Sequence, residues 1–269
     1  MRKTLLLTGG FDPVSETEIQ NALAYSRKGY EVYLYPEEAG ILPLLKRLKL
    51  LELAVKPYRH LHAGMLNADE EVSFRDFAEE EAEIRTGCFN KAAHGTRKML
   101  AEEGLYFEQI VDARCKPHRA AHSRSVAALC VELAHAHHLD EAQAWKAGMM
   151  HDITKKWDDE EGRRILSIYD PDKLDQNPRI WHSYTAPVWL RTVLGMHDAV
   201  ILKAIYSHTL GFGRSDLARI LYIADKCERT RGYDSEAEIA IAKKSLKEGA
   251  ALVLAESKKY LKETQGIIA

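Results

Sequence analysis

The pattern of apolar and polar positions separates the chain into two parts. Residues 4–8 and 31–35 are short apolar runs bounded by glycine or proline, a pattern typical of buried strands. Residues 16–27 between them have helical spacing, and Gly29 would end that helix. This order predicts a βαβ unit at the start of the chain.

The rest of the first part is helical or irregular by the same criteria. Residues 41–55 place apolar and basic side chains at helical spacing and predict a helix. Residues 69–85 are acidic and polar, with few apolar positions. We expect this segment to be an exposed helix or loop.

From about residue 86 onward the strand signal disappears and helical patterns follow one another. Residues 100–110 close the first part. Helices are expected over residues 119–138 and 198–208, from near Pro178, and after predicted N-caps at Asp140, Asp158, Ser215 and Ser235. Gln143 follows Asp140 by three residues, as in a capping box. The last helix is expected to run unbroken from Ser235 to about residue 263. We therefore predict an α/β domain over residues 1–110 and an all-α domain over residues 111–269 with a long C-terminal helix.

Composition limits the classes of partner. A net charge of -2 gives no overall field that would favour nucleic acid or acidic membranes. The four cysteines form no C-x-x-C pair, which argues against a zinc ribbon or a thioredoxin motif. No segment reaches the eighteen apolar residues of a membrane span. We expect a cytoplasmic protein that acts on a small molecule, and the sequence leaves a homodimer open.

Metal-ligating side chains stand on or at the ends of apolar helices. His122 lies on the face of Val126 and Leu129, His151-Asp152 ends an apolar helix, and Asp225 ends another. An acid or imidazole buried there needs a partner, and a metal is one solution. His182 and His208 fall between these stretches. Six nitrogen and oxygen ligands suggest a two-metal hydrolytic site, which most often cleaves phosphate esters or anhydrides.

Each histidine also has an ordinary interpretation. A single histidine on an apolar helix is usually a satisfied core residue, so only the joint pattern carries weight. We interpret the other grouped histidines as solvated: His60 and His62 in a loop, and His135, His137 and His138 beside polar residues.

The ordered ligands resemble the H…HD…D pattern of the HD superfamily of metal-dependent phosphohydrolases. The match is closer to its YqeK-like branch, the symmetrical bis(5'-nucleosyl)-tetraphosphatases. The segments that carry it are 119–122, 147–155, 181–182, 204–211 and 223–231. The resemblance implies an HD-domain helical bundle.

The resemblance also implies a mechanism. Family members hold two metal ions, divalent or mixed-valence, with iron ahead of manganese or cobalt, and split diadenosine tetraphosphate into two ADP through a metal-bridged hydroxide. One ion would be held by His122, His151, Asp152 and Asp225, and the other by Asp152, His182 and His208. Asp152 and Lys155 would be the catalytic residues. The substrate would be contacted by Lys155, Arg119, Thr209, Gly211 and Arg231.

The segment Gly9-Gly10-Phe11-Asp12-Pro13 is similar to the first loop of nicotinate-nucleotide adenylyltransferases. That family follows the loop with H-x-G-H, whose histidines contact nucleotide phosphates. Residues 15–18 here read Ser-Glu-Thr-Glu, and Glu18 would place negative charge where phosphates should lie. The resemblance implies a reduced Rossmann-like domain that is inactive in transfer. It would serve as a scaffold, or retain binding of a nucleotide or partner.

Two other functions stay open at this point. One is a different HD phosphohydrolase or phosphodiesterase, acting on a nucleoside monophosphate, a triphosphate or a cyclic dinucleotide. The other is a nucleotide-sensing protein without turnover. The complete set of ligands argues against the second, because a decayed site would be expected to lose ligands.

Overall fold

The computed structural model describes residues 2–74 and 76–265. It divides into two compact units, Met1–Tyr106 with Val193–Met196, and Phe107–Thr192 with His197–Ala269. The division falls a few residues before residue 110, because α5 (Phe107–Arg114) packs on α6 (Pro117–Ala136) and α7 (Glu141–Met150) of the second unit.

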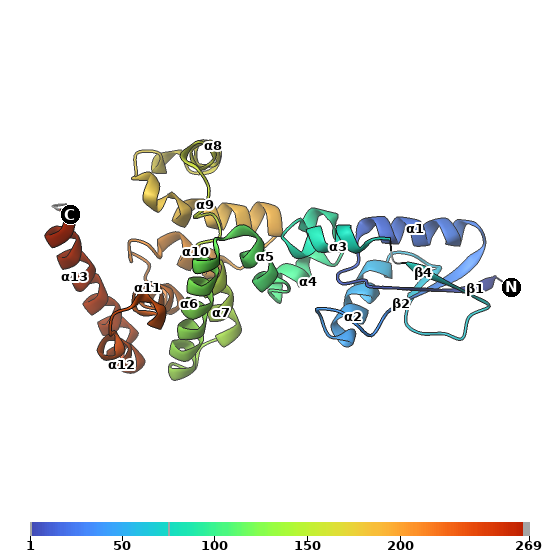
Figure 1. Cartoon of the computed structure of the whole chain (residues 1–269), viewed down its shortest axis with the longest axis horizontal. Helices are drawn as coiled ribbons and strands as arrows, with labels where there is room; N and C mark the ends of the chain where they lie inside the picture. Colours follow the sequence, from blue (N-terminus) through green and yellow to red (C-terminus); the bar gives the residue numbers. More distant parts are fainter. Residues whose placement is uncertain (1, 75, 266–269) are drawn as a thin grey trace. The chain divides into compact units, whose positions relative to one another are not determined.

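The first unit is built on a small parallel sheet. Its strands are β1 (Lys3–Gly9), β2 (Tyr30–Pro36), β3 (Leu61–Ala63) and β4 (Glu70–Phe74), in the order β3-β2-β1-β4. Figure 1 labels β1, β2 and β4. The register sets Leu5 opposite Val32 and Leu7 opposite Leu34, and these four side chains are buried. The α/β class expected for this part is confirmed.

Two of these strands were not predicted. Residues 69–85 contain β4 and α3 (Ala78–Arg85), not only an exposed helix or loop. β4 is an edge strand in which three of the five side chains are exposed and two of these are acidic, so it lacks the apolar pattern of a strand. His62 lies in β3, and His60 and His62 both contact the Glu31 carboxylate, at 3.0 and 2.5 Å. The placement of His62 in a loop was therefore wrong, whereas His60 lies in the turn before β3, and both rings are partly buried against Glu31 rather than fully solvated.

Short helices complete the first unit: α1 (Glu16–Arg27), α2 (Leu44–Val55), η1 (Phe89–Lys91) and α4 (Arg97–Glu102). α1 begins with a capping box, in which the Ser15 hydroxyl accepts from the Glu18 amide and the Glu18 carboxyl accepts from the Ser15 amide. Glu18 is fully buried, and burial raises the pKa of its carboxyl to about 8. The expected negative charge at this position is therefore absent at neutral pH, because burial favours the neutral carboxyl.

Every regular element in the described part of the second unit is a helix, as predicted. After α6 and α7 come α8 (Asp159–Tyr169), η2 (Pro171–Lys173), η3 (Pro178–Ile180), α9 (Trp181–Trp189), η4 (Leu190–Leu194), α10 (Ala199–Ser207), α11 (Asp216–Cys227), η5 (Arg229–Arg231), α12 (Glu236–Lys244) and α13 (Leu246–Gln265). The side chains of Asp140, Asp158 and Ser215 accept the capping hydrogen bonds that the sequence predicted. Gln143 does not complete a capping box, since its side-chain amide donates to the Asp198 carboxylate and not back to the start of the helix.

The last helix is broken, contrary to prediction. Ser245 has an extended backbone and separates α12 from α13, which pack on each other. Gly249 permits this packing, because a Cβ there would lie 2.7 Å from the Cα of Ala242. Ser235 does not cap α12, since its hydroxyl donates to the Cys227 carbonyl. Local helical propensity could not reveal a turn that tertiary packing imposes.

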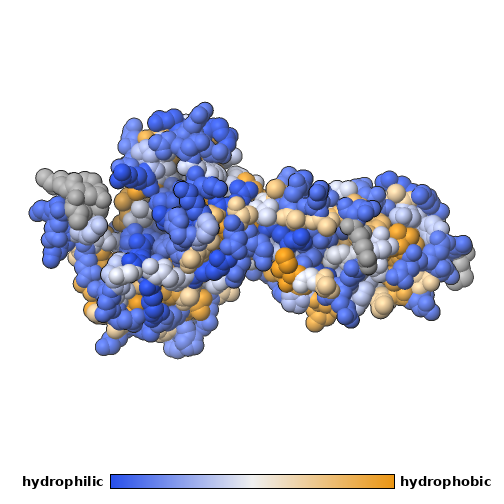
Figure 2. All heavy atoms as spheres, viewed as in Figure 1, coloured by the Kyte–Doolittle hydropathy of each residue, from blue (hydrophilic) through white to orange (hydrophobic). Residues whose placement is uncertain are grey.

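The visible surface is mainly hydrophilic, with apolar residues in small separate groups (Figure 2). Among the described residues, no helix combines the length and the apolar character that crossing a membrane requires.

Candidate metal centre

Five helices bring their ends or first turns to one place in the second unit. α6 supplies His122 from its second turn, and α9 supplies His182 from its first. His151 and His208 are the C-caps of α7 and α10, and Asp225 lies in the last turn of α11. A histidine that follows the last turn of an apolar helix is held by the core on one side and free to present its ring on the other.

The ligand atoms form two groups that share one carboxylate. His122, His151 and Asp152 offer atoms within 4.8 Å of one another, and so do Asp152, His182 and His208. All five side chains are buried. The Nε2 atoms of His182 and His208 lie 3.1 and 3.7 Å from Asp152 Oδ1.

Asp225 adjoins the first of these groups. Its Oδ1 lies 3.2 Å from His122 Nε2 and 3.7 Å from His151 Nε2. The structure therefore brings together all six side chains that the sequence proposed as ligands.

Backbone carbonyls orient two of the rings. His151 Nδ1 lies 2.7 Å from the Gly148 carbonyl, and His208 Nδ1 lies 2.6 Å from the Ile205 carbonyl. A carbonyl only accepts, so each Nδ1 carries the hydrogen and each Nε2 presents a lone pair to the centre. His151 Nε2 is buried and has no hydrogen-bond partner among the described residues. A buried lone pair without a donor is costly unless a cation completes it.

The same burial sets the protonation states. Burial lowers the pKa of His151 and of His182 to about 4, so both rings are neutral near pH 7. Burial opposes ionisation of Asp152 and Asp225, but the neighbouring His151 and Lys226 outweigh it and hold the pKa of each carboxyl well below its usual range. Neutral imidazoles and ionised carboxylates are the forms that bind metal ions.

The residues present fit a pair of metal ions. Four imidazoles and two carboxylates converge, Asp152 belongs to both groups, and one imidazole nitrogen has no hydrogen-bond partner in the described part of the chain. Nitrogen and oxygen ligands without a thiolate suit iron, manganese or cobalt.

Basic side chains surround the carboxylates of the centre. Arg119 Nη1 lies 2.8 Å from Asp152 Oδ2, and Arg231 Nη2 lies 2.9 Å from Asp225 Oδ1. Lys226 Nζ lies 2.8 Å from the other oxygen of Asp225, a contact the sequence did not predict. Lys155 Nζ lies 2.9 Å from His182 Nδ1, and burial lowers the pKa of this amine. The centre is thus ringed by donors that suit phosphate oxygens.

The other two substrate candidates differ in position. Thr209 Oγ1 lies 3.2 Å from Nε2 of both His182 and His208, so it borders the second group. Gly211 has a positive φ of 67°, and a Cβ there would lie 2.7 Å from the ring of Tyr222. Its backbone conformation and this close packing explain the glycine without a ligand.

Glu228 is a site residue to which the sequence reasoning gave no role. It is buried at the C-cap of α11, and its Oε1 lies 3.0 Å from His122 Nδ1. Burial lowers the pKa of His122, but hydrogen bonds to Asp225 and Glu228 outweigh it and raise the pKa overall. A carboxylate three residues past Asp225 was the available signal, but only the fold places it behind His122.

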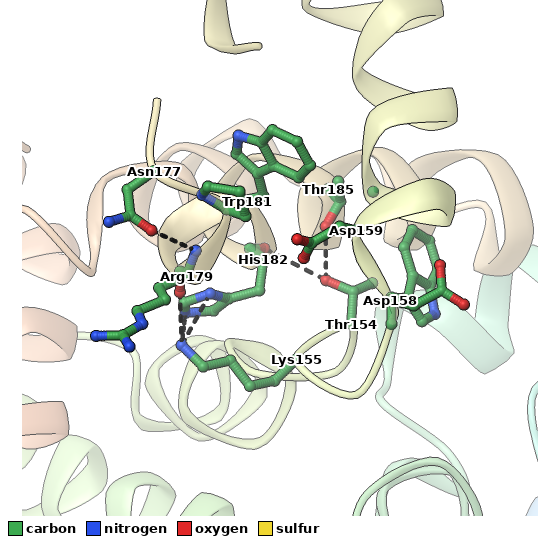
Figure 3. A pocket seen from close by; sticks show the side chains of 12 residues that line it. Thr154, Lys155, Asp158, Asp159, Asn177, Arg179, Trp181, His182 and Thr185 are labelled. Carbon is green, nitrogen blue, oxygen red and sulfur yellow. Dashed lines mark hydrogen bonds between the residues drawn. The ribbon is translucent and has the colours of Figure 1, made fainter. Parts of the chain in front are cut away.

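A pocket of about 560 Å³ opens beside the second group (Figure 3). Lys155 and His182 form one side of it. Its other walls come from the start of α8 and from η3 and the first turns of α9.

Comparisons with known proteins agree with this centre. The HD domain family model matches residues 119–230, which contain all six candidate ligands. The symmetrical bis(5'-nucleosyl)-tetraphosphatase of Bacillus subtilis (strain 168) is 31% identical over 144 residues, covering 52% of this chain and 76% of that protein. A probable nicotinate-nucleotide adenylyltransferase/Ap4A hydrolase of Mycoplasma pneumoniae is 28% identical over 158 residues, covering 55% of this chain. The match covers less than half, 45%, of that mycoplasmal protein.

A solved structure shows the same fold. A predicted HD superfamily hydrolase from Clostridium acetobutylicum superimposes with a TM-score of 0.55 and 24% identity, covering 61% of this chain and 89% of that one. The helical architecture of the second unit is therefore shared with a known HD protein.

Proposed function

Because this chain belongs to the HD-domain phosphohydrolases and is related to the symmetrical tetraphosphatases, we propose that it hydrolyses dinucleoside tetraphosphates. The reaction would convert diadenosine tetraphosphate and water into two ADP. Support for the substrate comes from the activity for which the Bacillus subtilis relative is named, and support for the chemistry comes from the ligand groups.

Each group of side chains would have a separate task. His122, His151, Asp152 and Asp225 would hold one metal ion, and Asp152, His182 and His208 the other, with iron expected ahead of manganese or cobalt. Metal ions, when bound, supply Lewis acidity that activates water and neutralises phosphate charge.

The basic residues at the rim would bind the polyphosphate. Lys155, Arg119 and Arg231 present cationic groups within hydrogen-bond distance of the ligand side chains. These donors would hold the scissile phosphorus against the centre and stabilise charge on its oxygens as the bond to the bridging oxygen breaks. Thr209 would add a neutral donor beside His182.

One observation carries the proposal: His151 Nε2, fully buried between two carboxylates, has no hydrogen-bond partner among the described residues. A structural histidine in such a place would be expected to use both ring nitrogens. A catalytic metal explains why one nitrogen is left for a ligand.

The test combines elemental analysis with a product assay. The His151→Ala variant is expected to lose both bound metal and hydrolysis of diadenosine tetraphosphate. The control is His135→Ala, because the ring of His135 is 80% exposed and pairs only with Glu141 among the described residues. Wild-type protein should yield ADP alone.

Three results would contradict the proposal. AMP plus ATP would mean asymmetric attack and a different substrate register. Turnover of a cyclic dinucleotide or a nucleoside triphosphate alone would mean another HD phosphohydrolase. Nucleotide binding without any turnover by the metal-loaded wild type would favour a sensing role.

We propose that the first unit no longer transfers nucleotides. The Ser15–Glu18 segment is used to cap α1, and Glu18 is buried in place of the second expected histidine. Arg47 is also buried and donates to the carbonyls of Gly10, Glu38 and Leu42, so it ties the glycine loop to its surroundings. The protein's own side chains, Arg47 at the glycine loop and Glu18 at the start of α1, therefore take the places where a nucleotide's phosphates would be expected.

A further inference from the structure

The pocket beside the metal centre has a charge pattern of its own. Lys155 and His182 lie on its inner side, with Asn177 and Arg179 on one flank and Asp158 and Asp159 on the other (Figure 3). Trp157, Trp181, Thr154, Thr185, Pro178 and Gly162 complete the lining. The volume of about 560 Å³ lies within the range of roughly 300–1,000 Å³ that is usual for small-molecule sites.

Several polar groups in this pocket are unused. Among the described residues, no hydrogen bond or ion pair engages the Asp159 carboxylate, the Arg179 guanidinium or the indole N–H of Trp157. By contrast, the Trp181 indole donates to the Lys173 carbonyl and its ring is almost fully buried. Trp157 is half-buried and is therefore the tryptophan whose ring a ligand can reach.

This arrangement disfavours two simple kinds of ligand inside the pocket itself, as distinct from the metal centre beside it. A bare polyphosphate would gain from Lys155 and Arg179 but would be repelled by Asp158 and Asp159. An apolar ligand would leave these charged groups desolvated and unpaired. The pocket instead suits a molecule that is anionic at one end and carries an aromatic ring with hydrogen-bond donors at the other.

We infer that this pocket binds the nucleoside part of the substrate, with the base stacked on Trp157 and its exocyclic amino group donating to Asp159. The phosphates then run past Lys155 towards His182, whose ring belongs to the second ligand group. This inference rests on the proposed function for the phosphate end only.

The chemistry of Asp159 makes the base selective. An ionised carboxylate only accepts hydrogen bonds, so it favours a base with an amino group and disfavours one with a carbonyl in the same place. Adenine carries an amino group at the position where hypoxanthine carries an oxygen. ADP should therefore bind more tightly than inosine diphosphate, and the preference should depend on Asp159.

The experiment is calorimetric titration of the metal-loaded full-length protein with ADP, inosine diphosphate and inorganic tripolyphosphate. Wild type should prefer ADP to inosine diphosphate by about tenfold, the size of a lost hydrogen bond to a charged group. Asp159→Ala should lower the affinity for ADP by about tenfold and abolish the preference for ADP over inosine diphosphate. The matched control Glu160→Ala removes an exposed acid from the same helical turn, outside the pocket lining. It should change neither the affinity for ADP nor the preference over inosine diphosphate.

The stacking part is tested separately. Trp157→Ala should lower the affinity for ADP by roughly tenfold, as expected for loss of an aromatic platform. The affinity for tripolyphosphate should stay within about twofold of the wild-type value. Trp157→Phe keeps a ring and should retain most of the affinity for ADP, and the unchanged binding of tripolyphosphate by Trp157→Ala shows that this variant is folded. Trp145→Phe, on α7 and outside the pocket lining, serves as the control.

Failure of this inference can be told apart from failure of the proposed function. If wild type hydrolyses diadenosine tetraphosphate but the Asp159 and Trp157 variants bind ADP normally, the nucleoside lies elsewhere and the inference is wrong. If wild type lacks that activity but still prefers ADP through Asp159, the pocket is supported and the assigned reaction is wrong. If Trp157→Ala loses tripolyphosphate binding together with ADP binding, that variant has lost its fold, and a tenfold loss of ADP affinity in a Trp157→Phe variant that keeps tripolyphosphate binding would then overturn the inference.

Discussion

Among single residues, His122 shows how the protein tunes a ligand. Its two ring nitrogens lie between Asp225 and Glu228, at 3.2 and 3.0 Å, and both carboxylates come from the end of α11. Glu228 also accepts from the backbone and hydroxyl of Thr230, so its own position is fixed. A carboxylate behind a ligating histidine orients the ring and increases its basicity.

Removing this carboxylate should weaken metal binding without removing a ligand. We expect Glu228→Ala to lower metal affinity by roughly 10–100-fold, the usual effect of losing such a partner. Glu228→Gln keeps an acceptor for the ring N–H of His122 and should lose less metal affinity than Glu228→Ala. Metal affinity is measured by competition with a chromophoric chelator.

The control for this series is Glu132→Gln. Glu132 pairs with Arg229 and Lys243 and touches none of the ligands among the described residues. Equal affinity in the Glu228→Ala variant and the wild type would show that Glu228 serves only the fold.

At the scale of elements, helix ends do most of the positioning. The α6 and α7 helices approach closely at Gly148, where a Cβ would lie 2.5 Å from the Ala127 Cα. The Gly148 carbonyl then accepts from His151, so the same close packing that joins the helices also orients a ligand. In the first unit, the start of α1 uses the residues that replace the transferase motif as its cap.

The α1 cap predicts a pH dependence of stability. The Glu18 carboxyl has a pKa of about 8 when folded, against 4.5 for an ordinary glutamate, because burial disfavours its charge. Between these values the folded state holds a proton that the unfolded state has lost. The free energy of unfolding should therefore fall as pH rises from 4.5 to about 8, by up to about 1.4 kcal/mol per pH unit from this group.

Glu18→Gln should remove that dependence. The free energy of unfolding of this variant, measured against that of wild type, should therefore be higher at pH 8 than at pH 5. Urea unfolding followed by far-ultraviolet circular dichroism measures the difference across this range. Glu16→Gln, in the same turn of α1, is the matched control. A difference between wild type and Glu18→Gln that stays constant with pH would mean that Glu18 ionises normally in the folded protein.

For the whole molecule, the two units can be observed separately. All four tryptophans, at 145, 157, 181 and 189, belong to the second unit, which also holds the metal centre. Tryptophan fluorescence therefore reports that unit, whereas circular dichroism reports both.

Removing metal should destabilise the second unit selectively. A ligand at a hundredfold excess over its dissociation constant adds about 2.7 kcal/mol to the free energy of unfolding. For a domain of this size that raises the unfolding temperature by roughly 5–10 °C. We expect a chelator to lower the fluorescence-detected unfolding temperature by that amount. A component of the circular dichroism transition from the first unit should not move. An unchanged fluorescence transition would mean that the ligand groups bind no metal when folded.

The sequence by itself determined the chemistry and the order of the main elements. Imidazoles and carboxylates at the ends of apolar helices identify themselves, because apolar periodicity and capping residues are local signals. The two first strands and the caps at Asp140, Asp158 and Ser215 follow from the same local rules.

Only the tertiary structure decided how distant residues combine. Glu228 meets His122 across 106 positions, and the pocket joins the start of α8 to η3 and α9. The acidic edge strand β4 depends on pairing with β1, and the break at Ser245 depends on α13 packing on α12. Burial, which sets the protonation of His151 and Glu18, is a property of the folded core and has no local signature.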